Sequence, residues 1–333
     1  MWNIALIGAG AIGKIHARNL AGHGRAKLTH VCDTNTAVAS SVAAEYGAHA
    51  AISVEDVLGS DVDGVIIASS TSTHGDVAKA CISAGKPFLC EKPLASDLST
   101  AQEIADSAGA TGLTAGMAFN RRLHPQYAGI KEAVAAGEIG RVESILITSR
   151  TAAAPTLEFI KTSGGLFGEK GSHFYDLARW ITGEHPVELF AMGAALVNPR
   201  FADISEVDTA MITMRFPSGA LCQLDFSWRA AYGQDERLEV SGSLGMVQTQ
   251  QSPVGPFLRF NPLGMTQDGP MPTWYERFEQ TYALELDVFF RALESGQPGE
   301  LPTLADGVAA QQVADGARQS VREGVPVTIT PMG

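Results

Sequence analysis

The sequence has few of the features that mark secreted, membrane-spanning or nucleic-acid-binding proteins. Its four cysteines among 333 residues form no C-x-x-C pair and show no matching histidine spacing, so buried reduced thiols are expected instead of disulfides or zinc ligands. No apolar run approaches the roughly 20 residues of a membrane-spanning helix. The 24 basic residues are outnumbered by 36 acidic ones, and the net charge of −12 argues against nucleic acid or an anionic membrane as a partner.

The N-terminal residues also lack the basic segment of a signal peptide. Met1 to Ala5 lead directly into a strand pattern, so we expect a cytoplasmic protein without a cleaved leader. The chain is 45% hydrophobic and 18% charged, which suits a large buried core. Its length predicts about two domains, and no internal repeat or low-complexity linker interrupts it.

A glycine-rich turn follows the first apolar run, Asn3 to Ile7. The segment Gly8-Ala9-Gly10-Ala11-Ile12-Gly13 opens a helical pattern that continues to Leu20. In such a strand–turn–helix unit the first glycine permits the tight turn and the second lets the backbone approach a pyrophosphate. The third lets the helix pack against the strand. The N–H groups and the dipole at the helix start favour phosphate, so the segment predicts dinucleotide binding.

A carboxylate ends the second predicted strand, Leu28 to Cys32. Asp33 lies 20 residues after Gly13, the spacing of an acidic residue that binds the adenosine ribose hydroxyls. Alternatively it caps the next helix, Thr36 to Tyr46, but that role would not explain the glycines. A carboxylate here repels the 2′-phosphate of NADP, and no Arg or Lys follows closely, so NAD is the expected cofactor.

A polar loop, Ser69 to His74, follows the predicted buried strand Asp63 to Ala68. Its hydroxyl residues, Ser69 and Thr71 among them, suit close contact with a cofactor or the capping of the next helix, predicted from about His74 to Ala84. His74 itself could bind the cofactor or lie in the first helical turn.

The strand Phe88 to Glu91 brings Glu91, Lys92 and Pro93 to one point. Proline disfavours helical geometry at Lys92, so the strand is expected to end there with the lysine held at its carboxyl end. Open α/β sheets bind their ligands at that edge. The alternative is a surface turn with a solvated glutamate and lysine.

The alternation of strands and helices predicts the α/β class. We expect an N-terminal Rossmann domain with a doubly wound parallel sheet, residues 1–121, closing near Asn120-Arg121-Arg122. After Gly140 consecutive strands predominate, with a hairpin signal at Pro217-Ser218-Gly219. This pattern predicts an α+β domain with a mostly antiparallel sheet, residues 122–333.

One segment of the second domain combines glycines with charged residues. Gly164-Gly165 precede Glu169 and His173, which stand four apart and would share one face of a helix. Asp176 could share that face, where a carboxylate beside an imidazole orients the ring and raises its basicity. The alternative is a structural histidine, with Asp176 paired to Arg179 on the surface.

Together these motifs resemble the glucose–fructose oxidoreductase and inositol dehydrogenase family, and the resemblance covers essentially the whole chain. It rests on Gly8-x-Gly10-x-x-Gly13, Glu91-Lys92-Pro93, and Gly164-Gly165 followed by His173-x-x-Asp176. It implies a Rossmann domain followed by a domain whose large open sheet mediates homodimers or homotetramers. It also implies that Lys92 lies at the nicotinamide and the substrate hydroxyl, and that His173 completes the site.

The chain departs from the family pattern at one position. Inositol dehydrogenases commonly have an aspartate four residues before the histidine, where this chain has Glu169 followed by Lys170. Glutamate keeps the charge and reaches one methylene further, and Lys170 becomes a second candidate for substrate contact. We expect His173 to take the hydroxyl proton and Lys92 to stabilise the alkoxide. Glu169 would orient His173 or bind a neighbouring hydroxyl.

The resulting expectation is an NAD-dependent oxidoreductase that oxidises a ring secondary alcohol of an inositol or related sugar or polyol by hydride transfer. One alternative is a sugar oxidoreductase or lyase with tightly held, recycled NAD. Another is an NAD-sensing regulator, which would not need Lys92 and His173. Asn120, Arg121 and Arg122 could bind substrate hydroxyls or only surface water, and no metal site is expected. The expected cofactor contacts are Gly8, Gly10, Ala11, Ile12, Gly13, Asp33, Ser69, Thr71, His74, Glu91 and Lys92.

Overall fold

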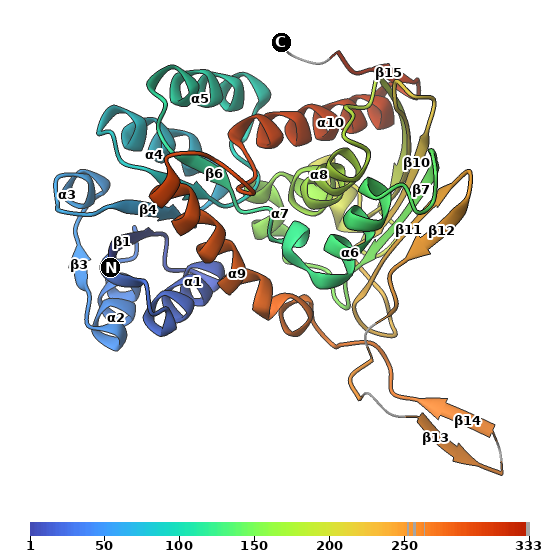
Figure 1. The fold of residues 1–333 in the computed structure, drawn as a ribbon, viewed down its shortest axis with the longest axis horizontal. Coiled ribbons are helices and arrows are strands. Elements are labelled where there is room, and N and C mark those ends of the chain that lie inside the picture. Colours follow the sequence, from blue (N-terminus) through green and yellow to red (C-terminus); the bar gives the residue numbers. More distant parts are fainter. Residues whose placement is uncertain (252, 256–257, 263, 331–333) are drawn as a thin grey trace. The chain divides into compact units, whose positions relative to one another are not determined.

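The chain folds into two compact units in the computed structural model, which describes residues 1–251, 253–255, 258–262 and 264–330 (Figure 1). The first unit contains Met1–Asn120, Thr162–Gly164 and Gln280–Gln311. The second contains Arg121–Lys161, Gly165–Glu279 and the segment from Gln312 onwards. The helical segment Gln280–Gln311 is therefore part of the first unit, whereas the sequence pattern predicts it within the second domain, residues 122–333.

The first unit is built on a six-stranded parallel sheet in the order β3-β2-β1-β4-β5-β6. Its strands are β1 (Trp2–Ile7), β2 (Ala26–Cys32), β3 (His49–Ala51), β4 (Gly64–Ile67), β5 (Phe88–Cys90) and β6 (Ala115–Met117). The connecting helices are α1 (Ala11–Gly22), α2 (Thr36–Tyr46), α3 (Val54–Leu58), α4 (Thr71–Ser83) and α5 (Leu98–Thr111). This strand order is that of the doubly wound dinucleotide-binding fold, as expected from the sequence.

Helices cover both faces of this sheet, with α1 and α2 on one side and α4 and α5 on the other (Figure 1). The interior strands β4 and β5 are buried at every residue, so they are continuously apolar instead of alternating. Because all six strands are parallel, their carboxyl ends meet at one edge. That edge gathers the turn after β1, Asp33 after β2, the polar loop after β4 and Lys92 after β5.

Two details of this unit differ from the sequence-based expectation. Strand β3 and helix α3 were not predicted, because segments this short carry little periodic signal of their own. Helix α4 begins at Thr71, not at His74. Here the Thr73 hydroxyl donates to the carbonyl of Ser70 at 2.8 Å, and Ser70 stands at the N-cap without a side-chain capping bond.

The second unit is built on a seven-stranded sheet in the order β12-β11-β7-β10-β9-β8-β15. Its strands are β7 (Val142–Arg150), β8 (Glu188–Ala194), β9 (Thr209–Arg215), β10 (Leu221–Ser227), β11 (Asp235–Gly242), β12 (Gly245–Gln248) and β15 (Val327–Thr328). Neighbouring strands are antiparallel except for β7 and β10, which are parallel. The expected mostly antiparallel sheet is confirmed.

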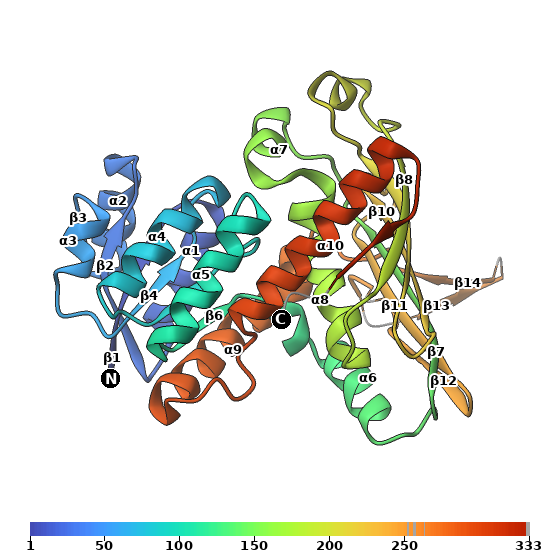
Figure 2. The same cartoon turned by 90° about the horizontal axis from the view of Figure 1, so that it is seen from above.

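Short and long helices connect or flank these strands. They are η1 (Asn120–Leu123), α6 (Pro125–Ala135), α7 (Leu157–Ser163), the π-helical turn η2 (Leu166–Lys170), α8 (Gly171–Thr182), η3 (Pro199–Ile204), α9 (Trp274–Ser295) and α10 (Leu304–Glu323). Helix α8 and the C-terminal half of α10 cover one face of the seven-stranded sheet (Figure 2). At β8, the backbone N–H of Ala191 donates to the Ser320 hydroxyl of α10 at 2.9 Å.

The opposite face of this sheet, the open face, is exposed among the described residues. Alternate residues along its strands are exposed, and several of them are large and apolar: Leu146, Phe190, Met192, Met211, Leu221 and Met246. The strands β13 (Leu258–Asn261) and β14 (Gly264–Gln267) form a separate hairpin. This hairpin is therefore not part of the seven-stranded sheet. Among the described residues, no helix has both the length and the apolar character needed to cross a membrane.

Candidate active site

The glycine turn after β1 has the geometry that a dinucleotide site requires. Gly8 adopts a φ of +97°, and a Cβ there would lie 2.3 Å from the backbone nitrogen of Ser69. A Cβ at Gly13 would lie 2.0 Å from the carbonyl oxygen of Gly8, so only glycine lets α1 approach the turn. A Cβ at Gly10 would meet nothing within 4 Å. Gly8 and Gly13 thus serve the fold, whereas the space beside Gly10 is open.

Asp33 is tied to this turn by its carboxylate. One oxygen accepts the backbone N–H of Ala9 at 2.7 Å, and the other accepts that of Asn35 at 2.8 Å. The cap of α2 is Asn35, whose side chain accepts the N–H of Val38. The alternative role of Asp33 as helix cap is therefore wrong. Asp33 instead joins the end of β2 to the turn that follows β1.

His74 braces two of the loops at this edge. It lies in the first turn of α4 and is 1% exposed, with Nδ1 2.8 Å from the carbonyl oxygen of Pro93 and Nε2 3.0 Å from that of Ser69. Burial lowers the pKa of His74. Thr71 is also buried, and Ser69 is partly exposed. Both ring nitrogens of His74 lie against backbone carbonyl oxygens, and a neutral ring donates to one of them, which favours a structural role over direct cofactor contact.

The Glu91-Lys92-Pro93 segment follows β5 directly, as the sequence predicts. Lys92 is partly exposed, and the peptide bond to Pro93 is cis. Glu91 is 8% exposed, and its carboxylate accepts a hydrogen bond from Nε2 of His16 at 2.9 Å. The surface-turn alternative is therefore wrong for Glu91. Sequence reasoning assigned Glu91 to the cofactor, whereas its carboxylate is turned toward α1.

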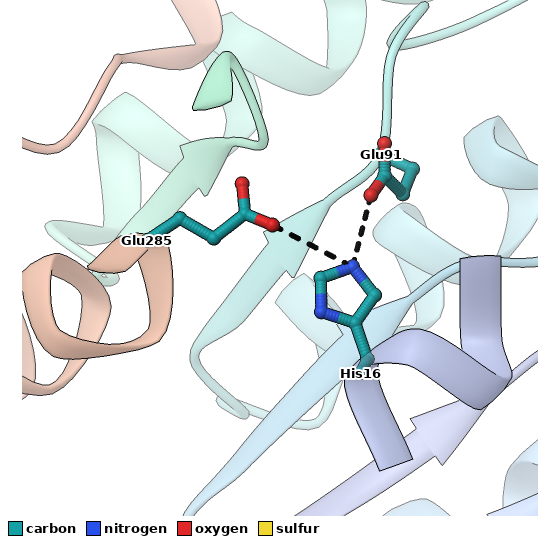
Figure 3. Close-up of side chains that lie close together, drawn as sticks. All are labelled: His16, Glu91 and Glu285. Carbon is teal, nitrogen blue, oxygen red and sulfur yellow. Dashed lines mark hydrogen bonds and ion pairs between the residues drawn. The ribbon is translucent and has the colours of Figure 1, made fainter. Parts of the chain in front are cut away.

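His16 lies between two carboxylates (Figure 3). Besides Glu91, Oε1 of Glu285 on α9 lies 3.8 Å from His16 Nε2. One ligand-type atom from each of these three buried side chains lies within 4.8 Å of the others, so the group has the composition of a possible metal site. Sequence reasoning missed His16 and Glu285. A histidine three residues after Gly13 was the available signal, whereas Glu285 is remote in sequence.

In the second unit, the segment after Gly164 enters α8 through a π-helical turn. Gly165 adopts a φ of +66°, and a Cβ there would lie 2.1 Å from a carboxylate oxygen of Glu206. Glu169 lies in the π turn and is partly exposed, and His173 lies in the first turn of α8 and is 7% exposed. Single π turns within helices are frequent at functional sites.

Lys170 is a buried cation beside these residues. It is 6% exposed, its ammonium lies 4.7 Å from the ring centroid of Trp228, and it donates to the Ser149 hydroxyl at 3.3 Å. The aromatic face and the hydroxyl both stabilise a positive charge that burial would otherwise penalise. The structure thus turns Lys170 inward from the π turn.

The residues after β6 are also buried. Asn120 is 1% exposed and Arg121 is 6% exposed, so the surface-water alternative is wrong for both. The Arg121 guanidinium lies 3.5 Å from the ring centroid of Phe278 and 3.5 Å from a carboxylate oxygen of Glu236. These contacts hold Arg121 in a fixed orientation.

Asp176 has a partner that the sequence did not suggest. It is fully buried, and both of its oxygens accept hydrogen bonds from Arg122, one of them at 2.8 Å from Nε. The alternative in which Asp176 pairs with Arg179 on the surface is therefore wrong. This pair joins η1 to α8.

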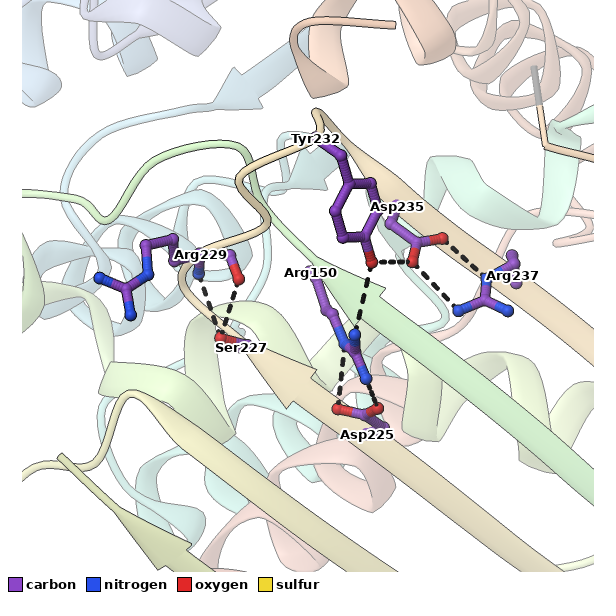
Figure 4. A network of polar contacts seen from close by, with 7 residues as sticks. All are labelled: Arg150, Asp225, Ser227, Arg229, Tyr232, Asp235 and Arg237. Atoms are coloured by element: carbon purple, nitrogen blue, oxygen red, sulfur yellow. Dashed lines mark hydrogen bonds and ion pairs between the residues drawn. The ribbon is translucent and has the colours of Figure 1, made fainter. Parts of the chain in front are cut away.

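A polar network lies at the end of β7 (Figure 4). Arg150 binds the carboxylate of Asp225 on the neighbouring strand, and that partner raises the pKa of Arg150. The Tyr232 hydroxyl donates to Asp235 at 2.6 Å, and Nε of Arg237 donates to the same carboxylate at 2.8 Å. Within this network Arg150 is paired with Asp225 and Arg237 with Asp235, all in the second unit.

Comparisons with known proteins agree with this architecture. Residues 2–119 match an oxidoreductase family described by its NAD-binding Rossmann fold, and residues 131–329 match the C-terminal alpha/beta domain of an oxidoreductase family. Inositol 2-dehydrogenase of Rhizobium meliloti is 35% identical over 326 residues, covering 97% of this chain and 98% of the relative.

Two solved structures illustrate the likeness in three dimensions. A myo-inositol dehydrogenase from Corynebacterium glutamicum is 33% identical with a TM-score of 0.93, and the match covers 100% of both chains. The scyllo-inositol dehydrogenase from Lactobacillus casei with bound NAD(H) and scyllo-inositol is 25% identical with a TM-score of 0.92. That match covers 99% of both chains.

Proposed function

Since this chain belongs to the glucose–fructose oxidoreductase and inositol dehydrogenase family and is a dehydrogenase acting on CH–OH groups, we propose that it oxidises a ring secondary alcohol of an inositol or a closely related cyclic polyol with NAD. The observation that carries this proposal is the position of Lys92. It lies at the carboxyl edge of the sheet, where Asp33 and the glycine turn also lie. A cation at that edge suits an alcohol that becomes an alkoxide.

The residues of the first unit fit a dinucleotide. Gly8 and Gly13 admit no side chain, and the space before Gly10 is open. The N-terminus of α1 favours the pyrophosphate, and the carboxylate of Asp33 can accept hydrogen bonds from the adenosine ribose hydroxyls. When bound, the nicotinamide supplies the chemistry of hydride acceptance.

The chain itself must handle the hydroxyl proton and the charge left behind. His173 takes the proton as general base, because a neutral imidazole accepts it at physiological pH. Lys92 stabilises the developing alkoxide, and Glu169 orients His173 or binds a neighbouring hydroxyl. Lys170, Asn120 and Arg121 are the further candidates for contact with substrate hydroxyls.

A screen for NADH formation tests the proposed substrate class. Inositol isomers, aldoses and sugar acids are offered separately with NAD, and absorbance at the NADH band is followed. Turnover of one or more inositols is expected, whereas turnover of aldoses alone would refute the inositol assignment. Purified protein that already carries NAD and turns over sugar without added cofactor would indicate the recycled-NAD reaction instead.

We also propose that the open face of the seven-stranded sheet joins two copies of the chain. This face carries exposed apolar side chains, among them Met192 and Met211, which are 66% and 44% exposed. On this face Arg215 and Glu188 are paired at 3.3 Å, which lowers the cost of burying these two charges. The resemblance of the sequence to this family likewise implies a homodimer or homotetramer.

Light scattering after size-exclusion chromatography tests this assembly. The double variant Met192→Glu/Met211→Glu should shift the protein to a monomer, because like charges would then face each other across the interface. The matched control is Ile52→Glu, which changes an 85% exposed apolar residue of the first unit. A wild-type monomer, or an unchanged double variant, would contradict the proposal.

A further inference from the structure

The His16 cluster links three elements of the first unit at one point. His16 is fully buried on α1, Glu91 follows β5, and Glu285 lies on α9. All three belong to the first unit, and Figure 3 shows His16 Nε2 directed at both carboxylates. The residue after Glu91 is Lys92, so the cluster contacts the backbone segment that carries the lysine.

The hydrogen bond between His16 and Glu91 sets the position of the proton. Nε2 faces an ionisable oxygen at 2.9 Å, so the hydrogen must lie on Nε2 for the ring to donate to a carboxylate. Within the described part of the chain, Nδ1 of His16 has no hydrogen-bond partner. The tautomer with Nε2–H therefore satisfies Glu91 without burying an unpaired N–H group.

Helix α9 holds the cluster from the other side. The Tyr282 ring contacts the His16 ring edge-on at 5.8 Å between centroids, one helical turn from Glu285. Further along, His23 Nε2 lies 3.1 Å from a carboxylate oxygen of Asp287. These contacts run along α1, so α9 fixes the rotation of the helix that presents His16 to Glu91.

We propose that His16 is a positioning residue for Lys92. Its Nε2–H anchors the Glu91 carboxylate to α1, so the backbone at Lys92 is held relative to the helix that begins at the dinucleotide turn. Without this donor the buried carboxylate would have to move toward water, because an unsatisfied charge in the interior is costly. The adjacent lysine would move with it. This inference rests on the proposed role of Lys92 in the reaction.

The substitution His16→Leu removes the donor and keeps an apolar side chain of similar size. We expect a 10- to 100-fold lower kcat on a polyol that the wild type oxidises, the scale of a roughly 1 Å misplacement. The affinity for NAD should be unchanged. The deuterium isotope effect on kcat should rise, because hydride transfer becomes slower than product release. His16→Gln keeps an N–H donor and should recover most of kcat.

A matched control separates positioning from general loss of helix packing. His23→Leu removes the comparable contact between α1 and α9 but lies far from Glu91 along the helix, so its kcat should equal that of wild type. In a Lys92→Ala background, His16→Leu should cause no further loss, because the residue it positions is absent. Full activity of His16→Leu, equal losses at His16 and His23, or additive losses with Lys92→Ala would overturn the proposal.

A further variant and a metal analysis complete the test. If His16→Leu does not fold, Glu91→Gln is measured instead, because a neutral amide oxygen accepts the His16 Nε2–H less strongly than a carboxylate does. Unchanged kcat and isotope effect in Glu91→Gln would then refute the proposed anchoring of Glu91 by His16. Metal analysis with and without EDTA must show no activity-linked metal, since a stoichiometric ion lost from His16→Leu would make the cluster a metal centre. Failure of the proposed substrate class can be distinguished from failure of this proposal, because the wild type would then form no NADH with any inositol.

Discussion

We expect the preference for NAD over NADP to depend on the charge of Asp33, and the surroundings of Asp33 set the magnitude of this preference. The carboxylate is held in place by the N–H groups of Ala9 and Asn35, so it cannot turn away from an added phosphate. Two unit charges about 4 Å apart repel by about 1 kcal/mol in water and by about 4 kcal/mol at an effective dielectric constant near 20. A phosphate carries about 1.5–2 charges near neutral pH.

Asp33 is partly exposed, so water screens it and the repulsion between its carboxylate and the phosphate lies in the lower part of the range of energies. A repulsion of about 2–4 kcal/mol corresponds to a preference for NAD of about 30- to 1,000-fold in kcat/KM. The substitution Asp33→Asn removes the charge and keeps an oxygen that can accept the Ala9 N–H. It should reduce the preference by at least about tenfold. Asp33→Ala is less suitable, because the buried Ala9 N–H would lose its acceptor.

The assay is kcat/KM for NAD and NADP with one polyol substrate. Asp63→Asn is the matched control, because its carboxylate accepts the backbone N–H of Asn3 at 2.7 Å, the same bond at a position before β4. It changes the net charge equally and should leave the cofactor ratio unchanged. Equal use of both cofactors by wild type, or an unaltered ratio in Asp33→Asn, would refute the reasoning.

Three further predictions follow from the same structure. Lys92→Ala should lower kcat by about 10²- to 10⁴-fold while NAD still binds, and near-normal turnover would contradict its role. In wild type kcat should rise with pH as His173 loses its proton, and His173→Ala should abolish that rise; identical profiles would assign the base elsewhere. Burial and the guanidinium of Arg179, which donates to Nδ1 at 3.0 Å, lower the pKa of His185 to about 4. The pKa of a histidine in the unfolded chain is about 6.5, so the stability that neutral His185 contributes is fully present above pH 6.5. It is lost as pH falls toward 4, by about 1–2 kcal/mol at this partly exposed site. Urea unfolding at pH 7 and pH 4.5 measures it, and His185→Gln should lack this component.

Several features of the first unit could be predicted from the sequence because they depend on local geometry. A strand, a glycine turn and a helix follow one another within twenty residues. The positions of Gly8 and Gly13 in this pattern predict the tight turn and the close helix packing that the structure has. Asp33 and Lys92 each end a strand, and parallel strands bring their carboxyl ends to one edge. The helix α2 was likewise expected over the residues observed, Thr36–Tyr46.

In the second unit the local pattern was only partly informative. The spacing of Glu169 and His173 indicated a helix, but the π turn before α8 changes the angular relation that a regular helix would give. Asp176 has an arginine three residues later in sequence, yet its partner is Arg122, 54 residues earlier. An ion pair between remote elements depends on how η1 and α8 pack, and no local pattern records it.

By itself, the sequence determined the dinucleotide turn, the strand ends that carry Asp33 and Lys92, and the family to which they point. Only the tertiary structure decided what surrounds those residues. The contact of Glu91 with His16 follows from the packing of α1 beside the end of β5. The approach of Glu285, which lies 194 residues after Glu91, follows from the position of α9 in the first unit. Turn geometry is set by a few adjacent residues, whereas the partner of a buried charge is set by the packing of elements distant along the chain.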